Sequence, residues 1–199
     1  TGGGDCPGLN AVIRAVVKAS FLRGWEVLGI IGGYEGALPP TNVRVLDYNV
    51  VNDLLTRGGT ILGTANRGRF SAKVGHGQPR QLPVELLEET KKGFASLGVD
   101  AVISIGGDGS LSIAQQMFEY GIPIIGVPKT IDNDLEGTML TFGFDSAVAC
   151  ATDAVALTAG QTSAGGGGSA ANTSTVSPFS TNCSDVPRGN LSWRACGDP

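Results

Sequence analysis

The stretch Ala101-Val-Ile-Ser-Ile-Gly-Gly-Asp-Gly-Ser110 is an apolar, β-branched run that breaks into glycine and a carboxylate. Such a run predicts a fully buried strand, followed by a loop at its carboxyl end. A second run, Ile122 to Val127, ends in the same way in Pro128-Lys-Thr-Ile-Asp-Asn-Asp134. Ligands of open parallel sheets bind in the crevice beyond the carboxyl ends of the strands. We therefore expect the two carboxylate-bearing loops to form a single site.

Strand-like and helical segments alternate around this stretch, which predicts an α/β fold: a doubly wound, Rossmann-like parallel sheet. Besides the two strands above, Trp25 to Ile31 reads as a strand and Arg57 to Phe70 contains a strand-like patch. Helices are expected at Ala11–Ser20, Val51–Leu55, Pro83–Leu97, Leu111–Tyr120 and Ser146–Leu157.

The composition changes from about Thr158 onward. Gly165 to Gly168 lie among serine, threonine, alanine and asparagine, and no periodic segment follows. Such a segment buries too little apolar surface to offset its ordering entropy. We expect one domain over residues 1–157 and a disordered tail over 158–199, in the place of a second domain. Because the chain opens on Thr1 inside a motif, we also expect that its true amino terminus is missing.

Composition and charge argue against several partners. The 199 residues carry a formal net charge of −4, so nothing favours nucleic acid or an anionic membrane as a partner. No apolar run is long enough to span a bilayer. The four cysteines, Cys6, Cys150, Cys183 and Cys196, form no Cys-x-x-Cys pair, and the single His76 cannot complete a metal cluster with them. A reduced, cytoplasmic protein is the simplest interpretation.

The two carboxylate loops suit phosphoryl transfer. Asp108 is a hard oxygen ligand of the kind that holds Mg²⁺ together with substrate phosphates. Asp132, with Thr130 and Asp134 beside it, could accept a proton from an attacking hydroxyl, and Lys129 could neutralise charge on the transferred group. The alternative is that Asp132 and Asn133 only form side-chain turns.

Three further features leave alternatives open. The glycine-rich turn Thr1–Asn10 precedes a helix, so it is either a phosphate-binding turn or only a tight connection into that helix. Tyr34 could stack on a base or cap the sheet. Arg67 and Arg69 could bridge phosphates or remain solvated.

These motifs resemble those of the phosphofructokinases, from Thr1 to about Ala156. The family's signatures match in order at Gly2–Asn10, Gly58–Thr64, Gly106–Ser110 and Pro128–Asp134, of which the last is highly specific. The resemblance implies transfer of the ATP γ-phosphoryl group to the 1-hydroxyl of fructose 6-phosphate. It also implies Mg²⁺ as cofactor, a place in glycolysis, and a cytoplasmic homodimer or homotetramer.

The resemblance assigns roles position by position. Asp132 resembles the proton acceptor, with Thr130, Asp134 and Lys129 as its active-site companions, and Asp108 resembles the Mg²⁺ ligand. The nucleotide-binding positions are Gly4, Tyr34, Gly107, Asp108, Gly109 and Ser110, to which Arg67 is added as a substitute for a family arginine that aligns with Asn66. Arg14 and Lys18 fall where some bacterial members bind allosteric effectors.

The phosphoryl donor depends on two positions. Pyrophosphate-using members resemble this chain at Lys129 but carry aspartate where Gly109 stands, and Lys129 also occurs in ATP-using members of the mixed-substrate subgroup. A carboxylate at Gly109 would repel a nucleotide phosphate, so we expect ATP as the donor.

Beyond about Ala156 the family continues into a sugar-binding half that has no counterpart here. We therefore expect little or no kinase activity from this chain. The alternatives are a pyrophosphate-dependent enzyme, a non-catalytic ATP-binding module, a non-functional truncated product, and a kinase of the NAD kinase and diacylglycerol kinase group. That group shares Gly-Gly-Asp-Gly but lacks the motif at Pro128–Asp134.

Overall fold

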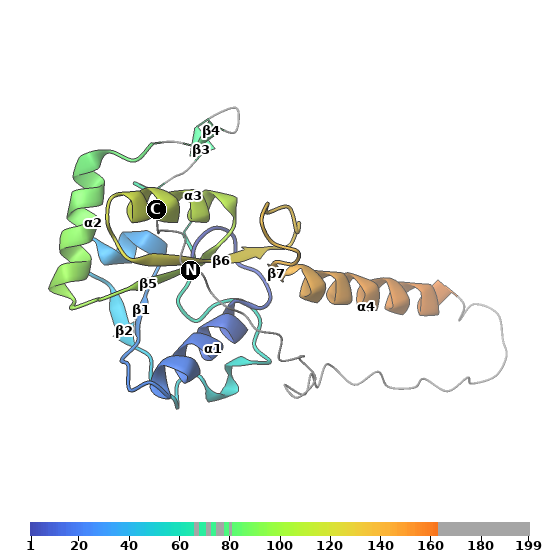
Figure 1. Ribbon diagram of the computed structural model, residues 1–199. Helices are drawn as coiled ribbons and strands as arrows, with labels where there is room; N and C mark the ends of the chain where they lie inside the picture. The colour runs from blue at the N-terminus through green and yellow to red at the C-terminus, as the bar shows by residue number, and fades with distance from the viewer. Residues whose placement is uncertain (66–67, 71–72, 75–77, 80, 163–199) are drawn as a thin grey trace.

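The computed structural model describes residues 1–65, 68–70, 73–74, 78–79 and 81–162. At its centre is a parallel sheet in the order β5-β6-β7, made of Val102–Gly106, Ile124–Thr130 and Phe142–Gly143 (Figure 1). Helix α3, Asp108–Glu119, connects β5 to its neighbour β6. The predicted parallel α/β sheet is confirmed, and the two carboxylate-bearing segments do follow adjacent strands.

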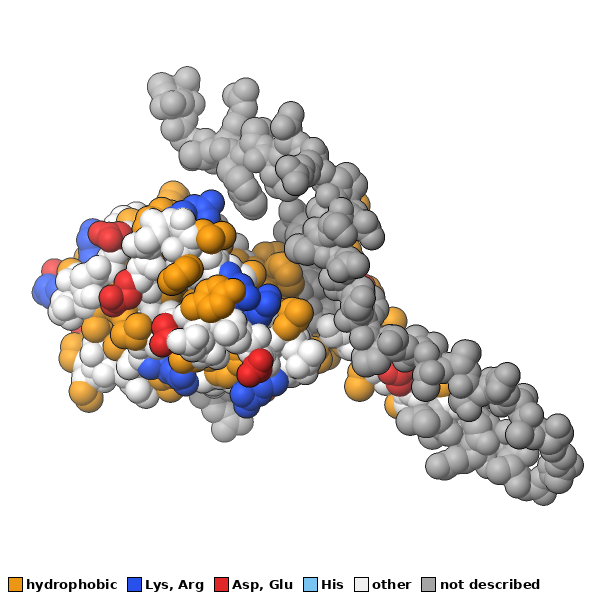
Figure 2. All heavy atoms as spheres, turned by 90° about the horizontal axis from the view of Figure 1, so that it is seen from below, with side chains coloured by type: hydrophobic (Ala, Val, Ile, Leu, Met, Phe, Trp, Pro, Cys, Tyr) orange, Lys and Arg blue, Asp and Glu red, His pale blue; other side chains and the backbone are white. Residues whose placement is uncertain are grey.

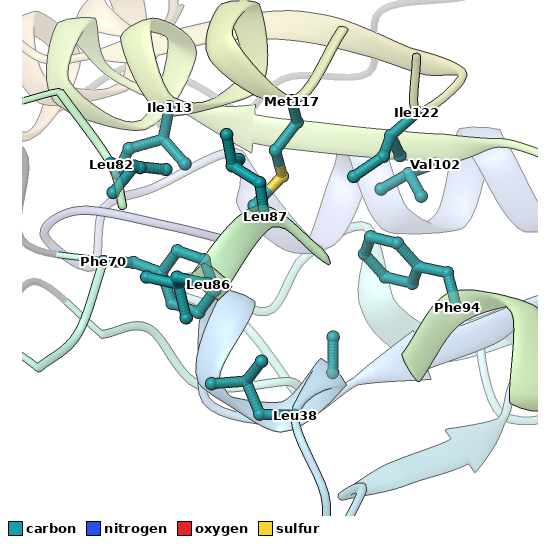
Figure 3. Close-up of a cluster of buried hydrophobic side chains, with 11 residues drawn as sticks. Leu38, Phe70, Leu82, Leu86, Leu87, Phe94, Val102, Ile113, Met117 and Ile122 are labelled. Atoms are coloured by element: carbon teal, nitrogen blue, oxygen red, sulfur yellow. The ribbon is translucent and has the colours of Figure 1, made fainter. Parts of the chain in front are cut away.

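Successive residues of a strand point to opposite faces of the sheet, so β5 contributes side chains to two separate cores. Helices cover both of these faces. Val102 packs with side chains from α2, Val84–Ser96, and from α3 (Figure 3). Ile105 packs on the other face against α1, Leu9–Phe21. The apolar faces of α1 and α2 are the ones that their sequence periodicity predicts.

Part of the central sheet is less buried than expected. Ile103 and Ile125 are partners in the β5–β6 register, yet they are 42% and 62% exposed. They share a face with Ile105 and Val127, which α1 helps to cover. The prediction of fully buried strands is therefore wrong at Ile103 and Ile125.

Outside the central sheet, short strands pair antiparallel: β1, Leu28–Ile30, with β2, Val43–Val45, and β3, Lys73–Val74, with β4, Gln78–Pro79. A 3₁₀ helix, η1, Gly33–Ala37, lies between β1 and β2 in the sequence, and a second one, η2, Asn52–Leu54, lies between β2 and β3. The expected strand-like patch between Arg57 and Phe70 shows only an isolated bridge from Ala65 to Gly2 among its described residues. The Gly2 N–H donates to Ile105 O at 2.9 Å, so the glycine-rich turn lies beside β5.

Two boundaries at the expected site differ from the prediction. The loop expected at Gly106–Ser110 ends early, because α3 begins at Asp108 with Gly107 as its N-cap. A carboxylate in the first turn suits the positive end of the helix dipole. Strand β6 runs on to Thr130, because Lys129 and Thr130 pair with β7.

Helix α4, Phe144–Thr162, leaves the body of the molecule beside β7 (Figure 1). The sequence predicts an end at Leu157, so the predicted domain boundary falls inside this helix. Residues 163–199 lie outside the described part of the chain.

No described helix is long and apolar enough to cross a membrane. On the face shown in Figure 2, acidic and basic side chains are interspersed. Cys6 and Cys150 are free thiols.

Candidate active site

A cavity of about 530 Å³ opens at the carboxyl ends of β5 and β6. Asp108, from the start of α3, and Asp132, from the loop after β6, both line it. Among the predicted site residues, those that line the cavity are Gly4, Tyr34, Gly107, Asp108, Gly109, Ser110, Lys129, Thr130, Asp132 and Asp134. The structure thus brings together every described residue that the resemblance assigns to catalysis or to nucleotide binding.

The amino terminus of α3 presents backbone donors to this cavity. The N–H of Leu111 donates to Gly107 O at 2.9 Å, so the N–H groups of Asp108, Gly109 and Ser110 precede that hydrogen bond. No side chain caps the helix at Gly107. Unpaired N–H groups and the helix dipole together favour an anion at such a position.

Two glycines make room for the Ser110 side chain. A Cβ on Gly106 would lie 2.7 Å from Ser110 Oγ, and a Cβ on Gly2 would lie 3.0 Å from Ser110 Cβ, with still closer contacts to other atoms of the same side chain. The glycine-rich turn, the end of β5 and the start of α3 therefore pack in direct contact.

Lys129 joins the two motifs of the site. Its Nζ donates to Gly4 O at 2.6 Å, and the residue is only 5% exposed. Burying an ammonium group costs free energy unless the group is hydrogen-bonded, as that of Lys129 is to Gly4 O. The positive charge of Lys129 therefore lies in the wall of the cavity. A lysine there both fixes the glycine-rich turn and offers a cation to an anionic ligand.

The loop after β6 is organised by Asn133 and Thr141. Asn133 adopts a left-handed conformation with φ 53°, and its Oδ1 accepts the N–H of Thr141 at 3.0 Å. Thr141 Oγ1 donates to Thr130 O at 2.8 Å, and Thr130 Oγ1 accepts the N–H of Asp132 at 3.1 Å. Asn133 thus ties this loop to Thr141, eight residues further along, whereas Asp132 lies at the cavity.

The Tyr34 hydroxyl is bound into the protein. It lies 2.5 Å from Ser104 Oγ on β5 and donates to Ser110 O on α3 at 2.9 Å. Burial raises the pKa of Tyr34 to about 12, against a smaller lowering by the hydrogen bond with Ser104. The hydroxyl thus contacts both β5 and α3, and Tyr34 is also one of the residues that line the cavity.

The basic residues that the sequence analysis considered do not share one location or one kind of partner. Arg67 lies outside the described residues. Arg69 binds Glu89 through two hydrogen bonds of 3.1 and 2.5 Å, and these bonds lower the pKa of the Glu89 carboxyl. Lys18 lies over the Tyr48 ring, 4.5 Å from its centroid. The Nε of Arg14 is buried with no hydrogen-bond partner among the described residues.

The helix α1 does not offer all of its first N–H groups to a ligand, because the Asn10 N–H donates to Gly59 O at 2.9 Å. The Asn10 side chain holds the same loop, with Nδ2 donating to Arg57 O at 3.0 Å and Oδ1 accepting the Ile61 N–H at 2.8 Å. Sequence reasoning missed this role. It also missed Asp5 and Cys6, which line the cavity within the motif it had identified.

The carboxylates of the cavity suit a lightly held Mg²⁺. Within the described ranges, no group of three histidine, cysteine, aspartate or glutamate side chains could hold a metal ion by itself. Mg²⁺ commonly binds through one or two carboxylates, with substrate phosphates and water as the other ligands. Asp108, at the helix terminus where phosphates would also bind, fits that mode.

A parallel sheet with helices on both faces, and a cavity at the strand ends bordered by glycine turns, define a Rossmann-like α/β domain. The chain belongs to the phosphofructokinase family, because the family model "Phosphofructokinase" matches residues 1–166.

Relatives and solved structures agree with this assignment. The chain is 51% identical over 159 residues to the ATP-dependent 6-phosphofructokinase of Chloroflexus aggregans, an alignment of 78% of this chain and 43% of the relative. It is 46% identical over 156 residues to the pyrophosphate–fructose 6-phosphate 1-phosphotransferase of Amycolatopsis mediterranei, covering 78% and 42%. The chain therefore spans less than half the length of these relatives.

The fold is similar to that of yeast phosphofructokinases. The Saccharomyces cerevisiae structure matches with a TM-score of 0.62 at 30% identity, covering 79% of this chain and 23% of that one. The Pichia pastoris structure, in the T-state, matches with a TM-score of 0.60 at 32% identity, covering 71% and 16%.

Proposed function

We propose that this chain is the phosphoryl-donor and catalytic part of a glycolytic 6-phosphofructokinase. The reaction is ATP + D-fructose 6-phosphate to ADP + D-fructose 1,6-bisphosphate. The observation that carries the proposal is the presence of Asp108 and Asp132 on one cavity, at the ends of adjacent parallel strands. Phosphoryl transfer needs such an arrangement, because positioning and charge stabilisation supply most of its catalysis.

Each residue has a defined part in the reaction. The N–H groups at the start of α3 and the Lys129 ammonium bind the donor phosphates. Asp132 takes the proton of the sugar 1-hydroxyl as that oxygen attacks the γ-phosphorus, and the bond from the γ-phosphorus to the ADP oxygen breaks. Asp108 would hold Mg²⁺, which would supply positive charge to neutralise the phosphates. Thr130 and Asp134 flank the base, and Gly4, Tyr34 and Arg67 belong to the nucleotide side.

Pyrophosphate is the second candidate donor. Relatives named for either donor match this chain at similar identity. Gly109 favours ATP, because it adds no carboxylate beside the donor phosphates.

The chain spans less than half the length of its relatives, so we expect these 199 residues by themselves to bind the donor with little or no turnover. The family context implies a cytoplasmic homo-oligomer for the full-length enzyme.

Calorimetric titration and a coupled assay test the proposal together. We expect Mg²⁺-dependent ATP binding that exceeds pyrophosphate binding, and product formation near background. Asp108→Asn should lose the Mg²⁺-dependent part of the affinity, whereas Asp132→Asn should keep it. Absence of any affinity for ATP or pyrophosphate would reject the donor site. Full turnover by the chain would instead overturn the expectation that it is catalytically incomplete, and pyrophosphate binding above ATP would reverse the donor.

A further inference from the structure

Tyr34 occupies an unusual place, because its hydroxyl joins both ends of the turn that leads into α3. Ser104 lies on β5 before Gly106, and Ser110 lies in the first turn of α3 after Gly107. A carbonyl can only accept, so the single phenolic proton goes to Ser110 O, and Ser104 Oγ must donate its own proton to the Tyr34 oxygen.

We propose that Tyr34 is a positioning residue, whose hydroxyl fastens the first turn of α3 to β5 and thereby holds the N–H groups of Asp108–Ser110 in the geometry that binds phosphate. This inference rests on the proposed donor site. It differs from base stacking, in which the ring alone would act and the hydroxyl would be dispensable.

The surroundings of Tyr34 make it a rigid anchor. Its ring lies 5.5 Å from the Phe70 ring at 44° and packs against the core that α2 and α3 share. Gly32 and Gly33 before it have φ values of 73° and 71°, a conformation that favours glycine and that turns the chain into η1. Since the ring is held by packing, its hydroxyl is already ordered before a ligand arrives.

The turn that Tyr34 spans needs such an anchor. Gly106 and Gly107 have no side chains to restrict them, and no side chain caps the helix at Gly107. Without the tyrosine hydroxyl, the Ser110 carbonyl would lose its link to β5, and the first turn of α3 would be freer to fray. The N–H groups of Asp108–Ser110 would then have to become ordered when the phosphate binds, and the affinity for the phosphate would fall.

The test compares two ligands on the intact chain. Tyr34→Phe keeps the ring and removes the hydroxyl, and Ser104→Ala removes its partner. We expect Tyr34→Phe to weaken binding of ATP and of inorganic tripolyphosphate by about the same factor, roughly fivefold to tenfold for loss of the hydrogen bonds. Tripolyphosphate has no base, so stacking cannot affect its affinity. Tyr48→Phe, at a residue that packs on Phe21 away from the cavity, is the matched control.

Two readouts are independent of any ligand. Amide hydrogen exchange at residues 108–111 should speed up in Tyr34→Phe while exchange in α1 stays unchanged. In Ser104→Ala the tyrosinate absorbance should show a further rise in the Tyr34 pKa, because the hydrogen bond that lowers it is lost.

Unchanged tripolyphosphate affinity in Tyr34→Phe, with loss of ATP affinity only in Tyr34→Leu, would overturn the proposal in favour of stacking. Should the wild-type chain bind neither ligand, the donor site itself fails, and the exchange measurement alone decides whether Tyr34 orders the turn.

Discussion

The Nζ atom of Lys129 lies 2.6 Å from the carbonyl oxygen of Gly4, joining residues that are 125 positions apart. Through this hydrogen bond the end of β6 holds the glycine-rich turn at the opening of the chain. Together with the Gly2 N–H on Ile105 O, it makes the two motifs parts of one cavity wall. The positive charge at that wall is buried, and an anionic ligand therefore meets it with little intervening water.

Replacing this lysine should weaken donor binding. In Lys129→Met the cavity loses its buried cation, and Gly4 O loses its partner. We expect a loss of at least about tenfold in affinity for ATP and for pyrophosphate, and a decrease of about 1 to 2 kcal/mol in the free energy of unfolding. Lys92→Met is the control, because that side chain is 75% exposed on α2. Donor affinities equal to wild type in Lys129→Met would show that the ammonium only supports the turn.

A methyl group on Gly106 should destabilise the site. The added Cβ would lie 2.7 Å from Ser110 Oγ and 3.3 Å from Gly2 O, with a still closer contact to Ser110 Cβ. We expect Gly106→Ala to lower the free energy of unfolding by about 1 to 3 kcal/mol, the usual cost of overpacking. Gly58→Ala is the matched control, because a Cβ there has nothing within 4 Å. Urea unfolding of both variants gives the comparison, and equal midpoints would contradict the packing described for Ser110.

Asn10 should matter for folding more than for chemistry. The residue is 2% exposed, and it binds Arg57 O, Gly58 O and the Ile61 N–H. In Asn10→Ala these backbone groups lose the buried side chain that links them, so we expect a decrease of about 1 to 3 kcal/mol in the free energy of unfolding. The exposed Asn52 provides the control, as Asn52→Ala should change it by less than about 0.5 kcal/mol. Thermal unfolding measures both, and similar melting temperatures would refute the bridging role.

The sequence was sufficient to predict the sheet and its site where local pattern and long-range pairing agree. The β-branched run at Ala101–Ile105, the helix that follows and the next apolar run predict a strand–helix–strand unit with parallel strands. Parallel pairing of β5 and β6 then puts Asp108 and Asp132 at the same edge of the sheet. The assignment of Pro128–Asp134 to that edge needed no tertiary information beyond the order of strands.

The remaining features depend on contacts that no local pattern encodes. Strand β6 is extended by pairing with β7, so Lys129 is a strand residue with its ammonium on a distant turn. Ile125 is 62% exposed although its neighbour Val127 packs against the core that α1 shares, and periodicity cannot tell which residues of a strand are covered. The role of Asn10 was missed because its partners, in the loop at Arg57–Ile61, are distant in sequence. The place of Asp5 was missed because the cavity that it lines exists only in the folded chain.

Tyr34 should give the chain a distinctive dependence of stability on alkaline pH. Its pKa is about 12 in the folded protein, mainly because burial disfavours the phenolate, whereas an unfolded tyrosine has a pKa of about 10. Between these values the unfolded chain releases the phenolic proton and the folded chain keeps it. The folded state then binds more protons, so the contribution of Tyr34 to stability decreases as pH rises.

This contribution is complete below about pH 10 and disappears as pH approaches about 12, amounting to roughly 2 to 3 kcal/mol over the interval. Other groups also titrate there, but they are common to wild type and Tyr34→Phe, so the difference between the two unfolding curves isolates the tyrosine. We expect the difference in the free energy of unfolding between wild type and Tyr34→Phe to shrink with rising pH in urea titrations. A difference that does not vary with pH would mean that the Tyr34 phenol ionises as easily in the folded chain as in the unfolded one. The buried hydroxyl could not then be the fixed link between β5 and α3.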